Sequence, residues 1–536
     1  MSSPRSLWQS LQYFKNKKLL TIFFFGVASG FPWVMIGSAM SGWLKDEGLS
    51  RSSIGLFGLI FVAYSINFLW SPLVDRVKVF ALTNLFGQRR SWIIISQLML
   101  VIMCWQLSYL DVQSSLSIMA MFGLFIAIAG ATQDIAIDAY RIDILGQQDT
   151  NEMAAGSAMA TSGWWTGYAG LGSVPFLLAD KPNWQWAEVY FVLSLIMAAL
   201  MITVLVVKEP ESDRQVKQGA IEQQYQTVLT QLKNRHWLVL FTLPLLPMLI
   251  AYANFGYPQW PEQIISTDHQ LLVISIAVLA TLVILIRHLI KLNQDVSGRL
   301  EFATPTSQVT STRAIRLTAW LLSTMVAPIE EFFKRNGVKL SLSILLFIFL
   351  FKLGEAYLGR MSVVFYREVG FSNADIAYYS KMINWSVTIV FSLIGSVFTI
   401  RYGILKGLFI GGIAMSASNL LFSLMALVGP NKALFAFTVL VDGFTSAWGS
   451  VAFVALLSVL CDKTFTASQY ALMASLGTFG RVMLGGYSGI VVDWLDGNWA
   501  MFFVLTALMV IPSLLFLYSI RKPLNAIIAR SQNHQT

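Results

Sequence analysis

The chain has 536 residues, of which 56% are hydrophobic and only 12% are charged, against about 25% charged residues in ordinary soluble domains. This composition excludes a soluble globular protein and predicts an all-α membrane protein that crosses the bilayer many times. The net charge of +9 is attributed to basic loops beside anionic lipid and not to nucleic-acid binding, because the lysines and arginines gather at span ends.

Hydrophobic stretches of about 20 residues match a hydrocarbon core of about 30 Å, and we predict fourteen of them as membrane spans. They lie near residues 19–43, 53–73, 91–110, 115–140, 153–178, 188–207, 237–257, 270–291, 340–365, 375–400, 405–428, 433–460, 468–491 and 499–520. Most of the 37 basic residues then fall on the side of both termini, which the positive-inside rule predicts to be cytoplasmic.

The spans group as six, two and six, which predicts a central insert between two helix bundles. The expected parts are a cytoplasmic N-terminus at 1–18, an N-terminal six-helix bundle at 19–208, a central insert at 209–339, a C-terminal six-helix bundle at 340–520 and a cytoplasmic tail at 521–536. The segment from Thr312 to Gly337 has apolar residues at steps of three and four but an uncharged core too short to span. It is expected to lie in the headgroup region.

Two carboxylates, Asp134 and Asp138, share one helix face at the end of the fourth span, and Arg141 follows on that face. A carboxylate inside the bilayer costs about 2.5–3.5 kcal/mol unless it faces a partner or a wet cavity, so it predicts a functional site. Burial favours the neutral acid and a nearby arginine favours the carboxylate, so alternation between these environments can move a proton. The alternative for Asp138 is simple pairing with Arg141.

The second half adds further ionisable residues inside its predicted spans. Glu355 and Asp442 join the two N-terminal acids as predicted proton-coupling residues, while Lys352, Lys381 and Arg481 are predicted to bind an anionic substrate. Carrying such a charge into a negative cell interior costs about 2.3 kcal/mol per charge per 100 mV, so uptake would require inward proton flow. The alternatives are a Lys352–Glu355 pair and a structural salt bridge between Asp442 and Arg481.

Aromatic and amide side chains near the expected cavity are candidate sugar-binding groups. Flat indole rings suit sugar rings, and amides can bond sugar hydroxyls; the candidates are Trp33, Asn67, Gln133, Trp164, Trp165, Trp385 and Trp448. The alternatives are a tryptophan belt at the membrane interface and bonds from the amides to neighbouring helices.

A possible gate follows the second span, where Asp75 and Arg76 precede Gly87-Gln88-Arg89-Arg90. An Asp-Arg pair at helix ends can hold the cytoplasmic face closed. Arg141 and Arg401 are the other predicted gating residues. Arg401 stands in a weaker copy of this loop in the second half, where Ile400 replaces the acid. The alternative is an ordinary positive-inside stop.

Other residue types indicate packing rather than chemistry. Gly26 and Gly30, like Gly163 and Gly167, have the spacing of close helix contacts. The two cysteines and four histidines show no ligand spacing, so no disulfide framework, metal site or cofactor is predicted beyond the proton as coupling ion.

Two six-helix halves are the pattern of the major facilitator superfamily, and local motifs narrow the resemblance. The sequence resembles the AmpG-type muropeptide permeases of that superfamily in Gly26-Val27-Ala28-Ser29-Gly30-Phe31-Pro32, Trp70-Ser71-Pro72-Leu73-Val74-Asp75-Arg76, Ala131-Thr132-Gln133-Asp134-Ile135-Ala136-Ile137-Asp138-Ala139-Tyr140, Phe351-Lys352-Leu353-Gly354-Glu355-Ala356-Tyr357, Ser446-Ala447-Trp448-Gly449-Ser450, Gln469-Tyr470-Ala471-Leu472 and Gly480-Arg481-Val482. Any one motif alone would be weak.

The resemblance implies a proton-driven symporter that imports N-acetylglucosaminyl-anhydro-N-acetylmuramyl peptides across the bacterial inner membrane for peptidoglycan recycling. It also implies a link to β-lactamase induction, since the cytoplasmic products signal it in some bacteria. Anhydromuropeptide, protons and membrane lipids are thus the expected partners of a monomer. The two extra spans depart from the pattern, and their role is left open.

Three alternative functions remain open at this stage. One is a transporter of another acyl- or sugar-linked anion, such as a coenzyme A ester. Another is a membrane enzyme acting on lipid-linked sugars, with Asp134 and Asp138 as acid and base. The enzyme hypothesis is weakened because the sequence has no nucleophile motif and no soluble catalytic domain, and a transporter is predicted instead. A sensor that uses the same fold is not excluded.

Overall fold

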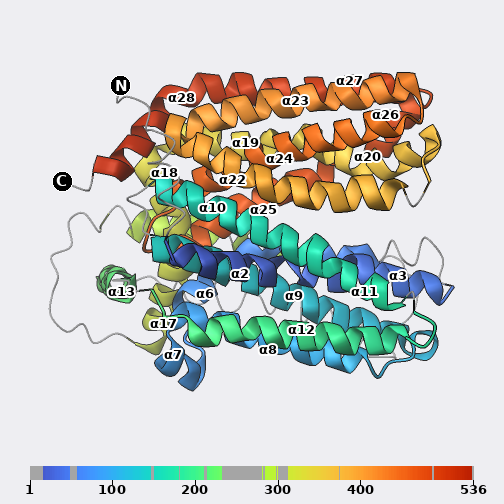
Figure 1. Ribbon diagram of the computed structural model, residues 1–536. Helices are drawn as coiled ribbons and strands as arrows, with labels where there is room; N and C mark the ends of the chain where they lie inside the picture. Colours follow the sequence, from blue (N-terminus) through green and yellow to red (C-terminus); the bar gives the residue numbers. More distant parts are fainter. Residues whose placement is uncertain are drawn as a thin grey trace, which may run out of the picture. The chain divides into compact units, whose positions relative to one another are not determined.

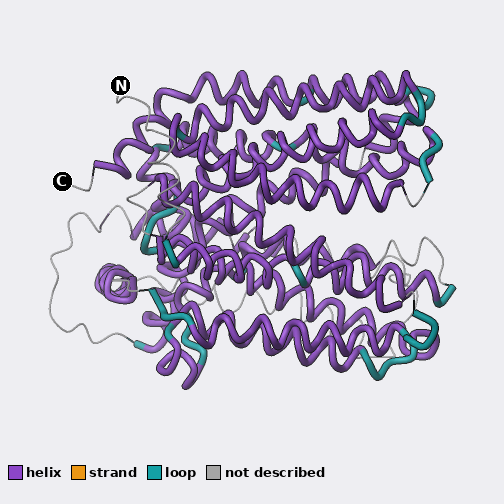
Figure 2. Tube along the Cα trace, viewed as in Figure 1, coloured by secondary structure: helices purple, strands orange, loops and turns teal. Residues whose placement is uncertain are grey.

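The structure is a computed structural model that describes residues 16–48, 57–145, 150–179, 181–210, 214–231, 280–281, 284–285, 287–296, 299, 312–372, 375–485 and 488–533. All regular structure in these residues is helical (Figure 2), as expected where hydrocarbon offers no partner to backbone polar groups. The chain divides into two compact units, one formed by Met1–Ser212 and Arg335–Thr536, and the other by Asp213–Lys334.

The first unit contains two helix bundles (Figure 1). Its N-terminal half consists of α2 (Lys18–Gly30), η2 (Val34–Ser38), α3 (Ala39–Asp46), η3 (Gly58–Phe61), α5 (Val62–Ile66), η4 (Asn67–Leu69), α6 (Ser71–Arg76), α7 (Phe80–Phe86), α8 (Gln88–Leu107), α9 (Val112–Leu145), α10 (Thr150–Trp165), η5 (Thr166–Gly170), η6 (Leu171–Ser173), α11 (Val174–Ala179) and α12 (Trp186–Val206). In several places, consecutive elements together form a helix of membrane length, and a π or 3₁₀ turn joins the pieces.

The C-terminal half begins after α18 (Ala327–Asn336), which crosses the boundary between the units. It consists of α19 (Val338–Phe351), α20 (Leu353–Val369), η8 (Ile376–Ile383), α22 (Asn384–Tyr402), α23 (Ile404–Val428), α24 (Lys432–Leu460), α25 (Thr466–Gly485), α26 (Ser488–Trp494), α27 (Trp499–Leu508) and α28 (Val510–Asn533). Gly403 connects α22 to α23 at a φ of +92°, a conformation that favours glycine.

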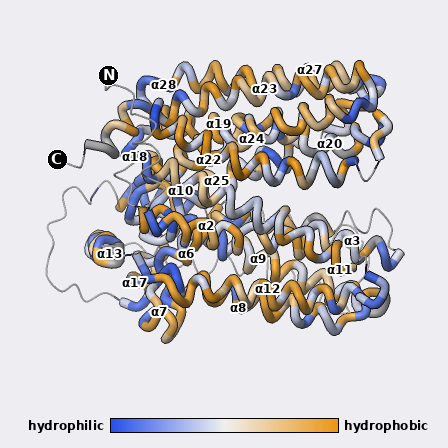
Figure 3. The backbone as a smooth tube through the Cα atoms, in the orientation of Figure 1, coloured by the Kyte–Doolittle hydropathy of each residue, from blue (hydrophilic) through white to orange (hydrophobic). Residues whose placement is uncertain are grey.

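Nine helices within the described residues are long and apolar enough to cross a membrane, so the predicted number of fourteen is not confirmed. The predicted span 237–257 lies outside the described residues, as does most of 270–291. The predicted spans 53–73, 153–178 and 468–491 are interrupted: the first two change helix type along their length, and the third is divided between α25 and α26. Figure 3 shows apolar residues along the long helices and polar ones near their ends.

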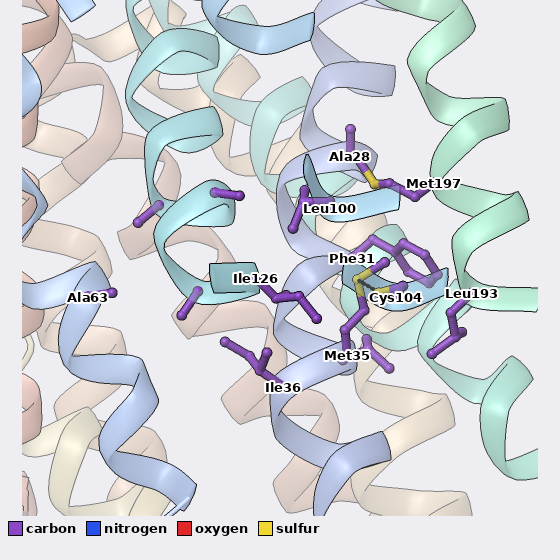
Figure 4. Close-up of a cluster of buried hydrophobic side chains, with 14 of the residues drawn as sticks. Ala28, Phe31, Met35, Ile36, Ala63, Leu100, Cys104, Ile126, Leu193 and Met197 are labelled. Atoms are coloured by element: carbon purple, nitrogen blue, oxygen red, sulfur yellow. Dashed lines mark hydrogen bonds between the residues drawn. The ribbon is translucent and has the colours of Figure 1, made fainter. Parts of the chain in front are cut away.

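A dense apolar core holds the N-terminal half together. Phe31, Met35 and Cys104 lie side by side in it (Figure 4), and all three are fully buried. The thiol of Cys104 donates to the Met35 sulfur at 3.3 Å. Cys104 and Cys461 are both buried and are not joined in a disulfide, which agrees with the sequence prediction.

Glycines allow α2 and α10 to touch through their backbones. A Cβ added at Gly26 would lie 2.6 Å from the Ala160 carbonyl oxygen. Added at Gly30, Gly163 or Gly167, it would overlap the facing backbone oxygen. The predicted close helix contacts at these glycines are therefore confirmed.

The two halves meet along a limited set of helices. α10 of the N-terminal half packs on α22 and α24, and α25 of the C-terminal half packs on α5, η4, α6 and α9. Two hydrogen bonds tie the halves together: the Ser475 hydroxyl on α25 donates to the Asn67 side-chain oxygen on η4, and the hydroxyls of Ser162 on α10 and Ser392 on α22 bond each other at 2.6 Å.

The second unit contains α13 (Arg214–Gln231), α17 (Arg313–Leu321), the π-helical turn η7 (Leu322–Val326) and most of α18. The amphipathic helix that the sequence predicts between Thr312 and Gly337 is thus present as consecutive helical pieces. Within this unit the Tyr225 hydroxyl donates to Asn293 at 2.8 Å, and Asn293 in turn donates to Glu330. The buried side chains of Tyr225 and Asn293 are therefore paired with each other and with Glu330.

Candidate transport site between the two halves

A cavity with a volume of about 100 Å³ lies between the halves of the first unit. Its walls are formed by Trp33, Tyr64, Asn67, Asp134, Ile135 and Asp138 from the N-terminal half and by Tyr470, Ala471, Ala474, Ser475 and Thr478 from α25. Both predicted aspartates thus face a space between the halves. The C-terminal wall is uncharged and consists of the aromatic Tyr470 together with small aliphatic and hydroxyl side chains.

The position of Asp134 along α9 predicts that it lies deep in the membrane. It precedes Leu145, the last residue of α9, by about 16 Å at a helical rise of 1.5 Å per residue, which is about half of a 30 Å hydrocarbon core. The Ser29 hydroxyl on α2 donates to Asp134 Oδ1 at 2.7 Å. The aspartate is only half-buried, so its carboxyl group keeps acceptor sites that face the cavity.

Asp138 lies one turn further along α9 and forms an ion pair with Arg141, whose Nη2 donates to Asp138 Oδ1 at 3.0 Å. Nη1 of the same guanidinium donates to Ser157 on α10 at 3.2 Å and to Ser458 on α24 at 3.1 Å. Arg141 also lies over the ring of Tyr470 on α25. One buried arginine therefore connects a cavity acid to two helices of the other half.

A second buried charge cluster, the latch, is formed by Asp75, Arg89, Asp143, Thr466 and Ser468. Arg89 forms ion pairs with Asp75 at 2.9 Å and with Asp143 at 3.0 Å, and its Nη2 donates to Thr466 Oγ1 at 2.6 Å. Asp75 accepts bonds from the Ser468 backbone N–H at 2.9 Å and from the Ser468 hydroxyl at 2.6 Å.

Asp75 lies at the first turn of α25, where a helix end stabilises its negative charge. The free N–H groups and the dipole at a helix N-terminus favour a negative charge, and here that charge comes from the opposite half. The end of the bundles that holds this cluster is called the latch end below. Lys18 near the start of α2 donates to the Ile144 carbonyl at 2.8 Å, so the ends of α2 and α9 also lie there.

Sequence reasoning found only part of the latch. It selected Asp75 but paired it with Arg76, whereas the structure pairs Asp75 with Arg89. Arg89 stood in the predicted loop motif, but nothing in its spacing marked it as the partner. Asp143 was missed because it reads as a surface acid after the predicted span. Arg401 lies over the ring of Tyr402 on its own helix and contributes no contact to the latch.

The acids and bases of the C-terminal half form a separate polar cluster. Lys352 pairs with Glu355 at 3.1 Å and donates to the Ser450 hydroxyl at 2.6 Å, which is the pairing named as the alternative at these positions. Ser446 donates to Glu355 at 2.8 Å, and Ser418 donates to Asp442 at 3.3 Å.

These residues do not line the cavity between the halves. Glu355 and Asp442 instead share a cavity of about 10 Å³ inside the C-terminal half, enough for about one water molecule. Arg481 interacts electrostatically with Glu355, and no ion pair joins Arg481 to Asp442, although both belong to the described part. The side chain of Lys381 lies outside the described residues.

The predicted tryptophans occupy three different environments. Trp33 contacts Tyr64 and Trp164, with ring centroids 4.7 and 5.8 Å away, at the cavity wall. Trp164 also stacks on Tyr168 at 5.0 Å and meets Trp165 edge-on at 5.6 Å. Together they form an aromatic cluster beside the acids.

The remaining candidates lie elsewhere. Trp385 crosses to the other half, where a Cβ added at Gly170 would lie 3.0 Å from its ring. Trp448 packs inside the C-terminal half against Phe398 at 4.5 Å and does not line the cavity. Gln133 donates to the Ala28 carbonyl at 2.7 Å and is fully buried, which is the helix-bonding alternative. No group of three or more His, Cys, Asp or Glu side chains within the described residues could hold a metal ion.

Comparison with known proteins agrees with this geometry of two bundles around a central cavity. The family model of the Major Facilitator Superfamily matches residues 22–300. The chain belongs to the major facilitator superfamily. As a superfamily member it is a multi-pass membrane transporter and not an enzyme, and the predicted fold class is confirmed.

Relatives confirm the resemblance that the motifs predicted. The chain is 26% identical over 518 residues to the anhydromuropeptide permease of Escherichia coli K12, covering 96% of this chain and 82% of that protein. It is also 26% identical over 512 residues to AmpG 4 of Rickettsia conorii, covering 96% and 98%. The matches extend across both halves.

Solved structures show the same superfamily fold at low sequence identity. The proton:xylose symporter XylE bound to 6-bromo-6-deoxy-D-glucose aligns with a TM-score of 0.57 at 12% identity, covering 94% of both chains. The human organic anion transporter MFSD10 aligns with a TM-score of 0.53 at 13% identity, covering 93% of this chain and 98% of that one.

Proposed function

We propose that this transporter imports N-acetylglucosaminyl-anhydro-N-acetylmuramyl peptides from the periplasm across the bacterial inner membrane, coupled to inward proton flow. The observation that carries the proposal is the placement of Asp134 and Asp138 on the wall of the cavity between the halves, beside Trp33 and Tyr64. The name of the E. coli relative, anhydromuropeptide permease, supports the substrate class. Imported muropeptide would then enter peptidoglycan recycling and feed β-lactamase induction.

The cavity is too small for a disaccharide-peptide in the state described. Its volume of about 100 Å³ falls below the roughly 300–1,000 Å³ of typical ligand sites. Binding therefore requires the two halves to separate around it. Both termini lie on the cytoplasmic side in this proposal, so the latch would seal the cytoplasmic face and the substrate would enter from the opposite end.

Asp138 and Arg141 provide a route by which a proton changes the contacts between the halves. As a carboxylate, Asp138 holds Nη2 of Arg141, while Nη1 reaches Ser458 of the other half. Protonation of Asp138 removes the negative partner of a buried guanidinium, which weakens its hold on Arg141. Movement of Arg141 would then release Ser458.

Asp134 is the better candidate for the proton that drives accumulation. It lies deeper than Asp138, its bonded partner is the neutral Ser29, and no ion pair holds it among the described residues. A carboxyl group in such a place can change protonation as the cavity opens to either side. The inward proton also offsets the cost of moving an anionic stem peptide against the membrane potential, about 2.3 kcal/mol per charge per 100 mV.

Transport of labelled disaccharide-tripeptide into proteoliposomes that contain the purified full-length protein tests the proposal. Vesicles preloaded with unlabelled muropeptide should accumulate the label by counterflow, and the recovered label should be chemically unchanged. Unlabelled muropeptide should compete, whereas acetyl-coenzyme A should not. Absence of counterflow would refute muropeptide transport, and competition by acetyl-coenzyme A alone would favour the coenzyme A ester alternative.

A further inference from the structure

Two hydrogen-bond donors on the cavity wall have no acceptor among the described residues. The indole Nε1 of Trp33 and the hydroxyl of Tyr64 are buried and unbonded, although both residues line the cavity. Tyr64 is 5% exposed. A buried polar group that is left unpaired is costly in free energy, so these two donors would gain from bonding a ligand's acceptor once the halves separate and expose them.

The Tyr64 hydroxyl packs against Gly130 of α9. A Cβ added at Gly130 would overlap the hydroxyl oxygen, so the glycine provides the space for it. Gly130 and Asp134 are four residues apart, so they share one face of the helix. The Tyr64 hydroxyl therefore lies one turn from Asp134, and the Trp33 ring lies next to Tyr64, with centroids 4.7 Å apart.

Asp134 adds an acceptor to these two donors. Its Oδ1 accepts from Ser29 at 2.7 Å, and a carboxylate has about four acceptor sites in total. The residues around the cavity thus bring two donors and one acceptor close together, and the Trp33 ring lies against the rings of Tyr64 and Phe61, with centroids 4.7 and 4.9 Å away.

We propose that Trp33, Tyr64 and Asp134 form a subsite for a secondary amide, the acetamido group of an N-acetylated sugar. The amide oxygen accepts bonds from Trp33 Nε1 and the Tyr64 hydroxyl, its N–H donates to the Asp134 carboxylate, and its methyl group packs on the aromatic faces. This inference rests on the proposed function and assigns its sugar specificity to these three residues. A hydroxyl in place of the acetamido group is too short to reach all three.

Calorimetric binding to the full-length protein in lipid nanodiscs tests the subsite. The two probes are N-acetylglucosaminyl-anhydro-N-acetylmuramic acid and its analogue with a 2-hydroxyl in place of the 2-acetamido group of the first sugar. The unmodified protein should bind the acetamido probe about tenfold more tightly, as expected for loss of one or two buried hydrogen bonds. Tyr64→Phe removes only the hydroxyl, and Trp33→Phe removes the indole N–H while leaving an aromatic ring; each should reduce this ratio severalfold.

Two further variants keep the test decisive. Gly130→Ala displaces the Tyr64 hydroxyl and should reduce the ratio as Tyr64→Phe does, whereas Tyr518→Phe, on an exposed ring, should leave it unchanged. An unchanged ratio in all three cavity variants, or equal binding of both probes by the unmodified protein, overturns the subsite. Failure of muropeptide counterflow with the binding ratio retained would overturn the proposed transport of muropeptides and leave the amide subsite standing.

Discussion

Asp75 on α6 caps the first turn of α25 in the opposite half, accepting bonds from both the backbone N–H and the hydroxyl of Ser468. The same carboxylate pairs with Arg89, so one buried charge joins three helices. Because this contact joins halves that would separate at one end in the proposed transport cycle, we expect its strength to affect how often the latch end opens.

The native Cys461 reports on this latch, since it is 1% exposed and follows α24 just before Thr466. Asp75→Asn removes the ion pair with Arg89 and weakens bonds that contribute about 1.5–3 kcal/mol when one partner is charged. Maleimide labelling of Cys461 should therefore become about tenfold faster or more. Labelling is measured by mass spectrometry over time.

Two controls accompany the measurement of the Cys461 labelling rate. Cys104 lies in the core of the N-terminal half and is fully buried, so its labelling should stay slow in every variant. Asp493→Asn changes an exposed carboxylate on α26 and should leave the Cys461 rate unchanged. Equal Cys461 rates in Asp75→Asn and the unmodified protein would show that the latch does not limit opening.

Arg141→Lys should impair transport while the protein stays folded. The guanidinium uses separate nitrogens for Asp138 and for the pair Ser157 and Ser458, and a single ammonium cannot reproduce this planar fork. We expect muropeptide uptake to fall by about tenfold or more. Uptake by this variant at the unmodified rate would argue against coupling through Arg141, and Arg521→Lys, on an arginine near the end of the chain, serves as the matched control.

Gly30→Ala should destabilise the N-terminal half. The added methyl group would overlap the Trp164 carbonyl oxygen on α10, and overpacking of this kind costs about 1–3 kcal/mol. Thermal unfolding in detergent should show a lower Tm than for Gly359→Ala, since Gly359 on α20 has open space around it. Equal Tm values for the two variants would mean that the α2–α10 contact adjusts without cost.

Much of the fold could be predicted from the sequence because hydrophobic length and helix periodicity are local properties. The long helices, the glycine contacts of α2 with α10 and the cavity position of Asp134 followed from such local patterns. Spans interrupted by π or 3₁₀ turns, such as the one divided among η3, α5, η4 and α6, appeared continuous because hydropathy does not record helix type.

Contacts between residues far apart in the sequence could not be predicted in the same way. The sequence places Arg89 beside Arg90 in a basic loop, and only the fold brings it to Asp143 and Thr466. Tyr64 likewise had no sequence signal, since an aromatic residue in an apolar span most often packs in a core. For Lys352 the decisive contact was local. We predicted it as a substrate ligand, but it pairs with Glu355, which lies three residues away on the next helical turn.

The role of Asp134 in proton coupling is the central step of the proposed mechanism, and accumulation of labelled muropeptide in proteoliposomes tests it directly. With an imposed inward proton gradient, the unmodified protein and Asp493→Asn should accumulate the label and lose it when a protonophore is added. Asp134→Asn should exchange label in counterflow but should not accumulate it. Gradient-driven accumulation by Asp134→Asn at the unmodified level would contradict the proposed mechanism.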